Sequence, residues 1–232
     1  MGKDFETHHD ATVGATPQQI WDAIATGPGI SSWFIGHTEI DGDTVRTDFG
    51  DDWIPAGTIT TSEPPNHFGY RSTPTPDGRF TAYEYLIEGR DRSTTVLRTV
   101  TSGFLPGDDW ADEYEAMQHG TALFFATLVA HLTHFPGRNT TPVTAFGPPV
   151  TDWPATWTAL HHTLGLTGPP KTGDPLPGGG QIYHTNPHTL GIRTDRGLYR
   201  YLRGFHGALI VQAPADGTDW TTFLTTLHPE ER

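Results

Sequence analysis

Hydrophobic and polar residues alternate in short runs over residues 5–102, and the pattern then changes to one long helical stripe. The alternating runs, bounded by turn residues, predict short antiparallel strands over 5–13, 37–48, 57–62, 67–73, 79–88 and 94–102. Residues 108–134 instead place apolar side chains three or four positions apart, which predicts a long amphipathic helix. Its stripe is Trp110, Tyr114, Met117, Thr121, Phe124, Leu128 and Leu132.

A short helix is predicted between the first two strands, in the segment "TPQQIWDAIATGPG". Thr16 and Gln19 have the spacing of a capping box, in which each residue satisfies a free backbone amide of the other. Gly27 and Pro28 are expected to end this helix. Trp33 and Phe34 follow at once, where turns usually carry polar residues, so these two aromatics need an explanation of their own.

The second part of the chain predicts a smaller α+β segment behind a linker. Residues 136–151 are rich in Pro, Gly and Thr, which favours a linker. Beyond it, the pattern predicts a helix from 152, extended runs over 180–186, 188–194 and 197–213, and a last helix over 218–228. We therefore expect a domain over 1–135, a linker over 136–151 and an extension over 152–232.

A faint internal repeat links the two parts. Residues 57–72 align with residues 180–194 after one gap, and the order of the neighbouring elements agrees. The coinciding pairs are Gly57 with Gly180, Ile59 with Ile182, Gly69 with Gly191, and Arg71 with Arg193. A truncated duplication and a chance match both stay open.

The order strand, helix, strands, long helix predicts an α+β fold, a curved antiparallel sheet around a long C-terminal helix. Such a sheet leaves a cavity between itself and the helix. Trp33 and Phe34 come directly after the first helix, which closes one end of this cavity. We expect these two aromatics to roof it.

Composition narrows the classes of function. The chain of 232 residues has a formal net charge of −13, which disfavours nucleic acid and anionic membranes as partners. It has no cysteine, so disulfides, thiolate catalysis and cysteine metal sites are excluded. No apolar run approaches the length of a membrane helix, and the N-terminus lacks a signal-peptide pattern, so we expect a cytoplasmic protein.

The segments "ATPQQIWDAIATGPGISSWF", "GTITTSEPPNHFGYRS" and "LRTVTSGF" resemble the START-like, or SRPBCC, superfamily. The most similar branch is the bacterial stand-alone form of the heat-shock-chaperone ATPase activator. The resemblance covers about residues 5–135 and implies a helix-grip fold around a hydrophobic pocket. Members bind lipids, hormones or polyketides, act on small molecules, or serve as co-chaperones, so the resemblance implies no single activity and no shared catalytic motif.

Aromatic residues are the strongest candidates for lining the pocket. Thr99 and Thr101 share a strand face with Leu97 and are expected to point inward, whereas Glu84 and Arg98 are expected to point outward. Thr121 offers a hydroxyl to a ligand or bonds the preceding turn. The candidate ligand-binding residues are Trp33, Phe34, Trp53, Phe68, Tyr70, Tyr83, Tyr85, Thr99, Thr101, Phe104, Trp110, Tyr114, Met117 and Thr121.

Catalytic and metal-binding candidates are weak. His119 lies near the apolar stripe of the long helix and is the candidate general acid or base. His8 and His9 are strand neighbours that point to opposite faces, and His131 and His134 have a chelating spacing without an evident third ligand. We expect no metal and no cofactor.

Three functions stay open at this point. The first is binding of a small hydrophobic or aromatic molecule between sheet and long helix, for transport, sequestration or self-protection. The second is a cofactor-independent cyclase, dehydratase or hydrolase acting on a polyketide-like substrate, and the third is a co-chaperone-like interaction module. The extension over 152–232 is a candidate for homodimer or interdomain packing.

Overall fold

The chain folds as two compact units, Met1–Thr141 and Pro142–Arg232, here named unit 1 and unit 2. The computed structural model describes residues 2–50, 52–89, 94–108, 110–204 and 207–227, and for residues 52 and 53 only the backbone. No helix among these residues is long and apolar enough to span a membrane.

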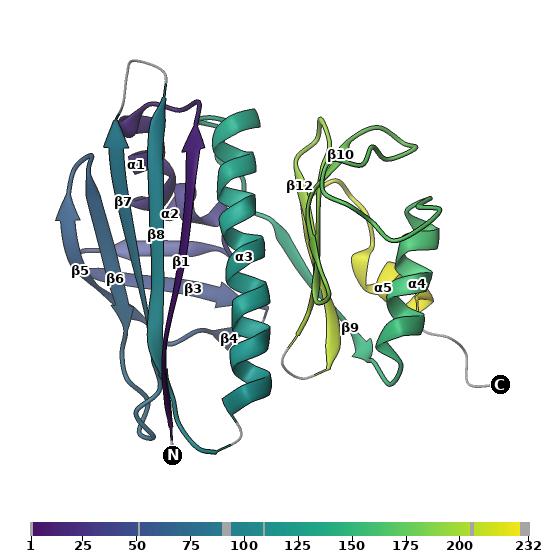
Figure 1. The fold of residues 1–232 in the computed structure, drawn as a ribbon, viewed down its shortest axis with the longest axis horizontal. Helices are drawn as coiled ribbons and strands as arrows, with labels where there is room; N and C mark the ends of the chain where they lie inside the picture. Colours follow the sequence, from purple (N-terminus) through teal and green to yellow (C-terminus); the bar gives the residue numbers. More distant parts are fainter. Residues whose placement is uncertain (1, 51, 90–93, 109, 205–206, 228–232) are drawn as a thin grey trace. The chain divides into compact units, whose positions relative to one another are not determined.

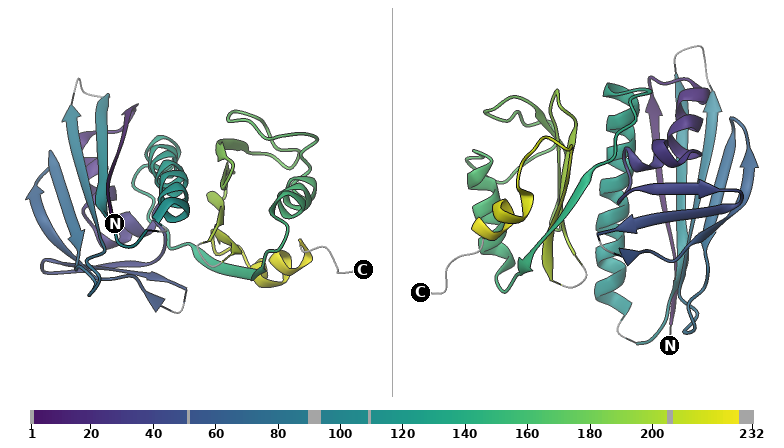
Figure 2. Two further views of the ribbon diagram at one scale, coloured as in Figure 1. Left: turned by 60° about the horizontal axis from the view of Figure 1, so that its bottom comes forward. Right: turned by 180° about the vertical axis from the view of Figure 1, so that it is seen from behind.

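Unit 1 is an antiparallel sheet that faces one long helix, α3 (Trp110–His134) (Figure 1). The strands lie in the order β1-β8-β7-β6-β5-β3-β2, and β4 pairs with β3. Their bounds are β1 (Lys3–Val13), β2 (Thr38–Asp41), β3 (Thr44–Phe49), β4 (Asp52–Trp53), β5 (Gly57–Glu63), β6 (His67–Ser72), β7 (Phe80–Gly89) and β8 (Thr95–Leu105). The sheet curves around the helix (Figure 2), so unit 1 has the α+β helix-grip fold that its sequence predicts.

The first helix is α1 (Pro17–Ile24), and its capping box is present as predicted. Gln19 donates its backbone N–H to the Thr16 hydroxyl at 3.2 Å, and its side chain accepts from the Thr16 backbone at 2.9 Å. Helix α1 ends at Ile24, shortly before the predicted end at Gly27 and Pro28. They open a second short helix, α2 (Gly27–Ser31), because the Thr26 side chain caps it by accepting from Gly29 N.

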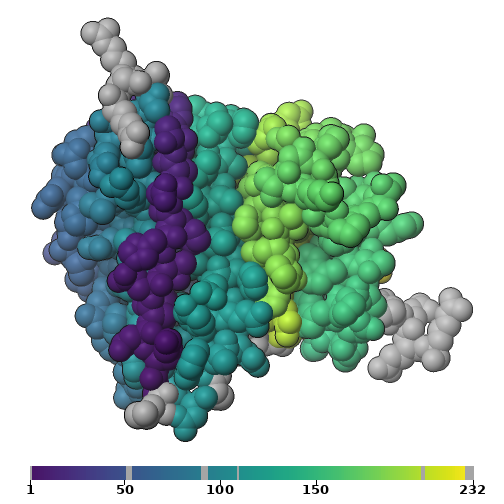
Figure 3. Space-filling model, viewed as in Figure 1, coloured from purple at the N-terminus to yellow at the C-terminus, as the bar shows by residue number. Residues whose placement is uncertain are grey.

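Helix α3 packs against β1 and β8, while α1 contacts both β7 and α3. Strand β1 runs as a continuous band beside α3 on the surface (Figure 3). Acidic Asp112 and Glu113 lie in the first turn of α3, where the helix dipole favours negative charge. The three helices therefore cover one face of the sheet, and that inner face belongs to the interior of unit 1.

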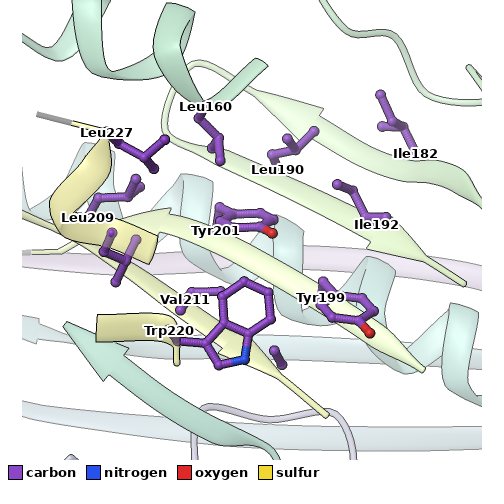
Figure 4. Close-up of a cluster of buried hydrophobic side chains, with 12 residues drawn as sticks. Leu160, Ile182, Leu190, Ile192, Tyr199, Tyr201, Leu209, Val211, Trp220 and Leu227 are labelled. Atoms are coloured by element: carbon purple, nitrogen blue, oxygen red, sulfur yellow. The ribbon is translucent and has the colours of Figure 1, made fainter. Parts of the chain in front are cut away.

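Unit 2 is a second antiparallel sheet, with strands in the order β10-β11-β12-β13-β9. Helices α4 (Trp153–Thr163) and α5 (Trp220–Thr226) pack on one face of it around buried side chains that include Leu160, Tyr201 and Trp220 (Figure 4). The strands are β9 (Val143–Pro149), β10 (Gln181–Asn186), β11 (Thr189–Arg193), β12 (Leu198–Arg203) and β13 (Ala208–Ala213).

The segment over 136–151, expected to be a linker, contains strand β9. This strand pairs with β13, for example through Ala145 opposite Val211. The sequence pattern did not predict this strand because Pro and Gly near its end normally break a strand. They are tolerated here because β9 lies at the edge of the sheet. Residues 142–151 therefore belong to unit 2.

Gly103 on β8 offers a direct test of the inner face. A Cβ placed on Gly103 lies 2.3 Å from the Phe80 carbonyl oxygen and 2.7 Å from the Phe5 ring, whereas one on Gly14 meets nothing within 4 Å. We expect Gly103→Ala to lower the free energy of unfolding by about 1–3 kcal/mol, and Gly14→Ala to leave it nearly unchanged. Urea unfolding of both variants measures this difference, and equal midpoints would contradict the close packing.

Candidate functional site

Aromatic side chains from several elements of unit 1 meet on the inner face of the sheet. Phe68 and Tyr70 come from β6, Tyr83 and Tyr85 from β7, and further rings from α1, α3 and the segment after α2. We name this group the ring cluster; its members are Trp21, Trp33, Phe34, Phe68, Tyr70, Tyr83, Tyr85 and Phe124. Six of them were candidates from sequence alone. Phe124 was placed only in the stripe of the long helix, and Trp21 only within the predicted first helix.

Trp33 and Phe34 hold the cluster together, which explains two large aromatics at this point of the chain. The Trp33 indole N–H donates to the Ala23 carbonyl of α1 at 2.9 Å, and its ring lies 6.2 Å from that of Tyr85. The Phe34 ring lies 5.6 Å from Tyr83 and 5.2 Å from Phe124 of α3. Phe34 therefore bridges the sheet and the long helix.

Two rows of paired residues cross the inner face. In the first row Tyr70 pairs with Tyr83, Tyr83 with Thr101, and Thr101 with Thr7.

The second row runs Phe68, Tyr85, Thr99, His9 in the same way. Cross-strand neighbours lie about 5 Å apart at their Cβ atoms, so each row brings aromatic rings and hydroxyls side by side. Neither row contains Asp, Glu, Lys or Arg.

The three tyrosines of these rows stay protonated well above neutral pH. Burial, and then the neighbouring Tyr85 and Tyr83, raise the pKa of Tyr70 well above its usual value. Desolvation raises the pKa of Tyr83 to about 12, and burial raises the pKa of Tyr85 further still. The buried Tyr70 hydroxyl also has no well-aligned hydrogen-bond partner among the described residues.

The buried threonines of unit 1 differ in their surroundings. On β8, Thr95 donates to the Ala15 carbonyl at 2.7 Å, and Thr127 donates within its own helix at 2.8 Å. Thr99 and Thr101 are only 7% and 6% exposed, and they pair with Tyr85 and Tyr83 of the ring cluster. Two hydroxyls thus lie beside the ring cluster on the inner face.

The charged residues of the same strands lie on the opposite face, as predicted. Glu84 and Arg98 are exposed, and Arg98 pairs with Glu88 on the neighbouring strand. Phe104, however, shares the parity of Arg98 and lies on this outer face, opposite Phe80. Its ring does not belong with the cluster, because a strand turns alternate side chains to opposite faces.

The remaining candidates lie away from the two rows or make local contacts. Trp110 and Tyr114 form a second aromatic group with Phe5, with Tyr114 and Phe5 centroids 6.2 Å apart. Thr121 donates to the Gln118 carbonyl at 3.1 Å, which is the local bond that a helical threonine commonly makes. Met117 is half-buried on α3, and the side chain of Trp53 lies outside the described residues.

His9 is the polar residue that the sequence interpretation missed. Its ring stacks on Phe125 of α3 with centroids 5.2 Å apart, and its Nε2 is buried without a partner among the described residues. Burial, helped by His8, lowers the pKa of His9, so the imidazole is neutral near pH 7. His119 instead lies 3.8 Å from the exposed carboxylate of Glu115, one turn earlier on the same helix.

No protein-family model and no curated protein matches the chain. Solved structures that are similar include the Aha1 dimer from Colwellia psychrerythraea, at 19% identity and a TM-score of 0.46, with 55% of this chain and 96% of that chain covered. Another is a Thalictrum norcoclaurine synthase point mutant with a bound transition-state analogue, at 13% identity and a TM-score of 0.43. The match covers 57% of this chain and 96% of that chain.

A third is the di-domain ARO/CYC BexL from the BE-7585A biosynthetic pathway, at 11% identity and a TM-score of 0.49. The match covers 92% of this chain and 86% of that chain. No function comes to this chain from these likenesses.

The buried tyrosines predict a loss of stability at high pH. The unfolded chain releases tyrosine protons near pH 10, while folded Tyr70, Tyr83 and Tyr85 retain theirs. The free energy of unfolding therefore falls as the pH rises from about 10 toward 12. Tyrosinate absorbance of folded and urea-unfolded protein measures the difference in the pH at which the tyrosines ionise. Ionisation of all seven tyrosines near pH 10 in the folded protein would contradict the prediction.

Proposed function

We propose that unit 1 binds a small aromatic molecule against the ring cluster, between the sheet and α3. The observation that carries this proposal is the buried Tyr70 hydroxyl, which has no well-aligned hydrogen bond to the described residues, together with the inward-facing hydroxyls of Thr99 and Thr101 in the same two rows. Sites for small molecules combine an apolar, aromatic lining with a few polar groups that fix orientation. The two rows of the inner face have this composition.

Packing alone does not account for the Tyr70 hydroxyl. A buried hydroxyl without a partner costs about 1–3 kcal/mol, and a phenylalanine of similar shape would avoid that cost. A bound molecule with a hydrogen-bonding group recovers it. The ring cluster would supply stacking and edge contacts worth about 0.5–1.5 kcal/mol for each aromatic pair beyond burial.

The variant Tyr70→Phe separates binding from folding. It removes a buried hydroxyl that has no well-aligned hydrogen bond and keeps the ring, so we expect the free energy of unfolding to stay equal or to rise by up to about 1 kcal/mol. The affinity for naphthol, an uncharged aromatic alcohol, should fall severalfold. Isothermal titration calorimetry and native mass spectrometry of the full chain measure both.

Naphthalene, which lacks the hydroxyl, is the matched control for the ligand. Its affinity should be the same for the wild type and for Tyr70→Phe. Absence of binding of either compound to the wild-type protein would contradict the proposed function for this class of ligand. A large loss of stability in Tyr70→Phe would show instead that the hydroxyl has a structural partner.

An enzyme is the second candidate, and the observation that favours it is His9 rather than His119. His9 pairs with Thr99 in the same row, and its half-buried, neutral imidazole, whose Nε2 is buried, has the protonation state of a general base near pH 7.

We expect compounds from an aromatic and polyketide-like panel to be retained with unchanged mass. Time-resolved native mass spectrometry decides this. A mass change in the wild type that disappears in His9→Asn would transfer the assignment to a cofactor-independent enzyme.

The co-chaperone alternative has less support from the described residues. Such a module needs an exposed partner surface, and the large hydrophobic side chains that are exposed are Val143 and Phe146 of unit 2. Homodimer formation or packing through residues 152–232 stays a prediction, which sedimentation velocity of the full chain would test.

A further inference from the structure

We propose that unit 2 is a reduced second copy of the unit 1 fold, and that Thr99 and Thr101 determine where and what the protein binds. Because unit 2 lacks both hydroxyls, one ligand with an uncharged hydrogen-bonding group would bind per chain, in unit 1. The part of this inference that concerns the ligand rests on the proposed function.

The two sheets share their topology. Unit 1 contains the strand order β1-β8-β7-β6-β5, and unit 2 has the order β9-β13-β12-β11-β10. In each unit the first strand is followed by a capped helix and pairs antiparallel with the last strand. The final helix then packs on that same pair, α3 on β1 and β8, and α5 on β9 and β13. The described residues of unit 2 contain no counterpart of α2, β2, β3 and β4.

A bulge fixes the residue-by-residue equivalence. The β5–β6 pairing shifts between Ile59 and Thr61, and Thr61 then pairs with Gly69. The β10–β11 pairing shifts between Ile182 and His184, and His184 then pairs with Gly191. A bulge is a local irregularity that a chance sequence match does not predict. It falls at the residue pairs Ile59/Ile182 and Gly69/Gly191 that coincide in the sequence repeat.

Counted from the bulge, the two tyrosines of β7 have counterparts in β12 of unit 2. Tyr70 pairs with Tyr83 just as Ile192 pairs with Tyr199.

In the second row, Phe68 pairs with Tyr85 just as Leu190 pairs with Tyr201. Tyr199 and Tyr201 are therefore the counterparts of Tyr83 and Tyr85. The repeat thus extends beyond the aligned segment into the next strand.

The next strand is where the two copies differ in polarity. Tyr85 pairs with Thr99 and Thr99 with His9, whereas Tyr201 pairs with Val211 and Val211 with Ala145.

Thr101, two residues after Thr99, corresponds to Ala213, two residues after Val211. The positions that carry Thr99 and Thr101 in unit 1 thus carry apolar residues in unit 2. Val211 and Ala213 are fully buried there.

A tryptophan covers the tyrosine pair of unit 2. The Trp220 ring lies 5.9 Å from Tyr199 and 6.4 Å from Tyr201 (Figure 4). These side chains belong to the packed core of this smaller unit. The buried Nε1 of Trp220 has no partner among the described residues, so unit 2 also holds a polar atom without a partner. The number of ligands bound per chain therefore has to be measured for the whole chain.

The composition of the rows also sets the charge of the ligand. The two rows of unit 1 offer hydroxyls and a neutral imidazole, and no cation that would pair with a carboxylate. Burying an ionised group without a partner is costly. We therefore expect naphthol to bind at least tenfold more tightly than naphthoate.

The closing experiment titrates naphthol and naphthalene into the full chain and into two matched variants. Thr99→Val removes a hydroxyl at constant shape in unit 1, and Val211→Thr adds one at the equivalent position of unit 2. We expect one equivalent of naphthol per wild-type chain. Thr99→Val should weaken naphthol binding about threefold to tenfold and leave naphthalene binding unchanged. Val211→Thr should leave both affinities unchanged and lower the unfolding midpoint.

The outcomes separate this inference from the proposed function. Two equivalents of naphthol, or an unchanged naphthol affinity in Thr99→Val, would overturn the inference while binding to unit 1 stands. No binding of naphthol or naphthalene would overturn both. An unfolding midpoint that Val211→Thr leaves unchanged would overturn the assignment of a closed apolar core to unit 2.

Discussion

The contact of Phe34 with Tyr83 on one side and Phe124 on the other is the interaction on which the interior of unit 1 depends. It joins three parts of the chain that are far apart in sequence: the segment after α2, strand β7 and helix α3. Trp33, held to α1 by its indole N–H, orients that segment from behind. The short helices therefore act as a scaffold that places two rings between the sheet and the long helix.

Local patterns in the sequence predict most of unit 1. The capping box at Thr16 and Gln19, the strand alternation and the long helical stripe depend on neighbours within a few residues, and the structure agrees with them. The inward direction of Thr99 and Thr101 follows from parity on one strand. Helix α2 was missed because its Gly-Pro-Gly start is typical of a turn, and the cap from Thr26 is what makes it helical.

Features that depend on distant partners were not predictable in the same way. Phe104 was counted with the pocket because it is aromatic, although its parity with Arg98 already placed it on the other face. His9 gains its environment from Phe125, more than a hundred residues away, and no local pattern indicates that contact. Strand β9 is recognisable only through its pairing with β13. Its own composition favours a linker.

The pairing of the first strand with the last in each unit has a consequence for how the chain folds during synthesis. β1 has no partner until β8 has left the ribosome, and β9 has none until β13 has followed. Each unit therefore completes its sheet only when its last strand is available, through contacts between residues that are far apart in sequence. Since β8 and α3 both precede β9 along the chain, all parts of the ring cluster are synthesised before the sheet of unit 2 can form.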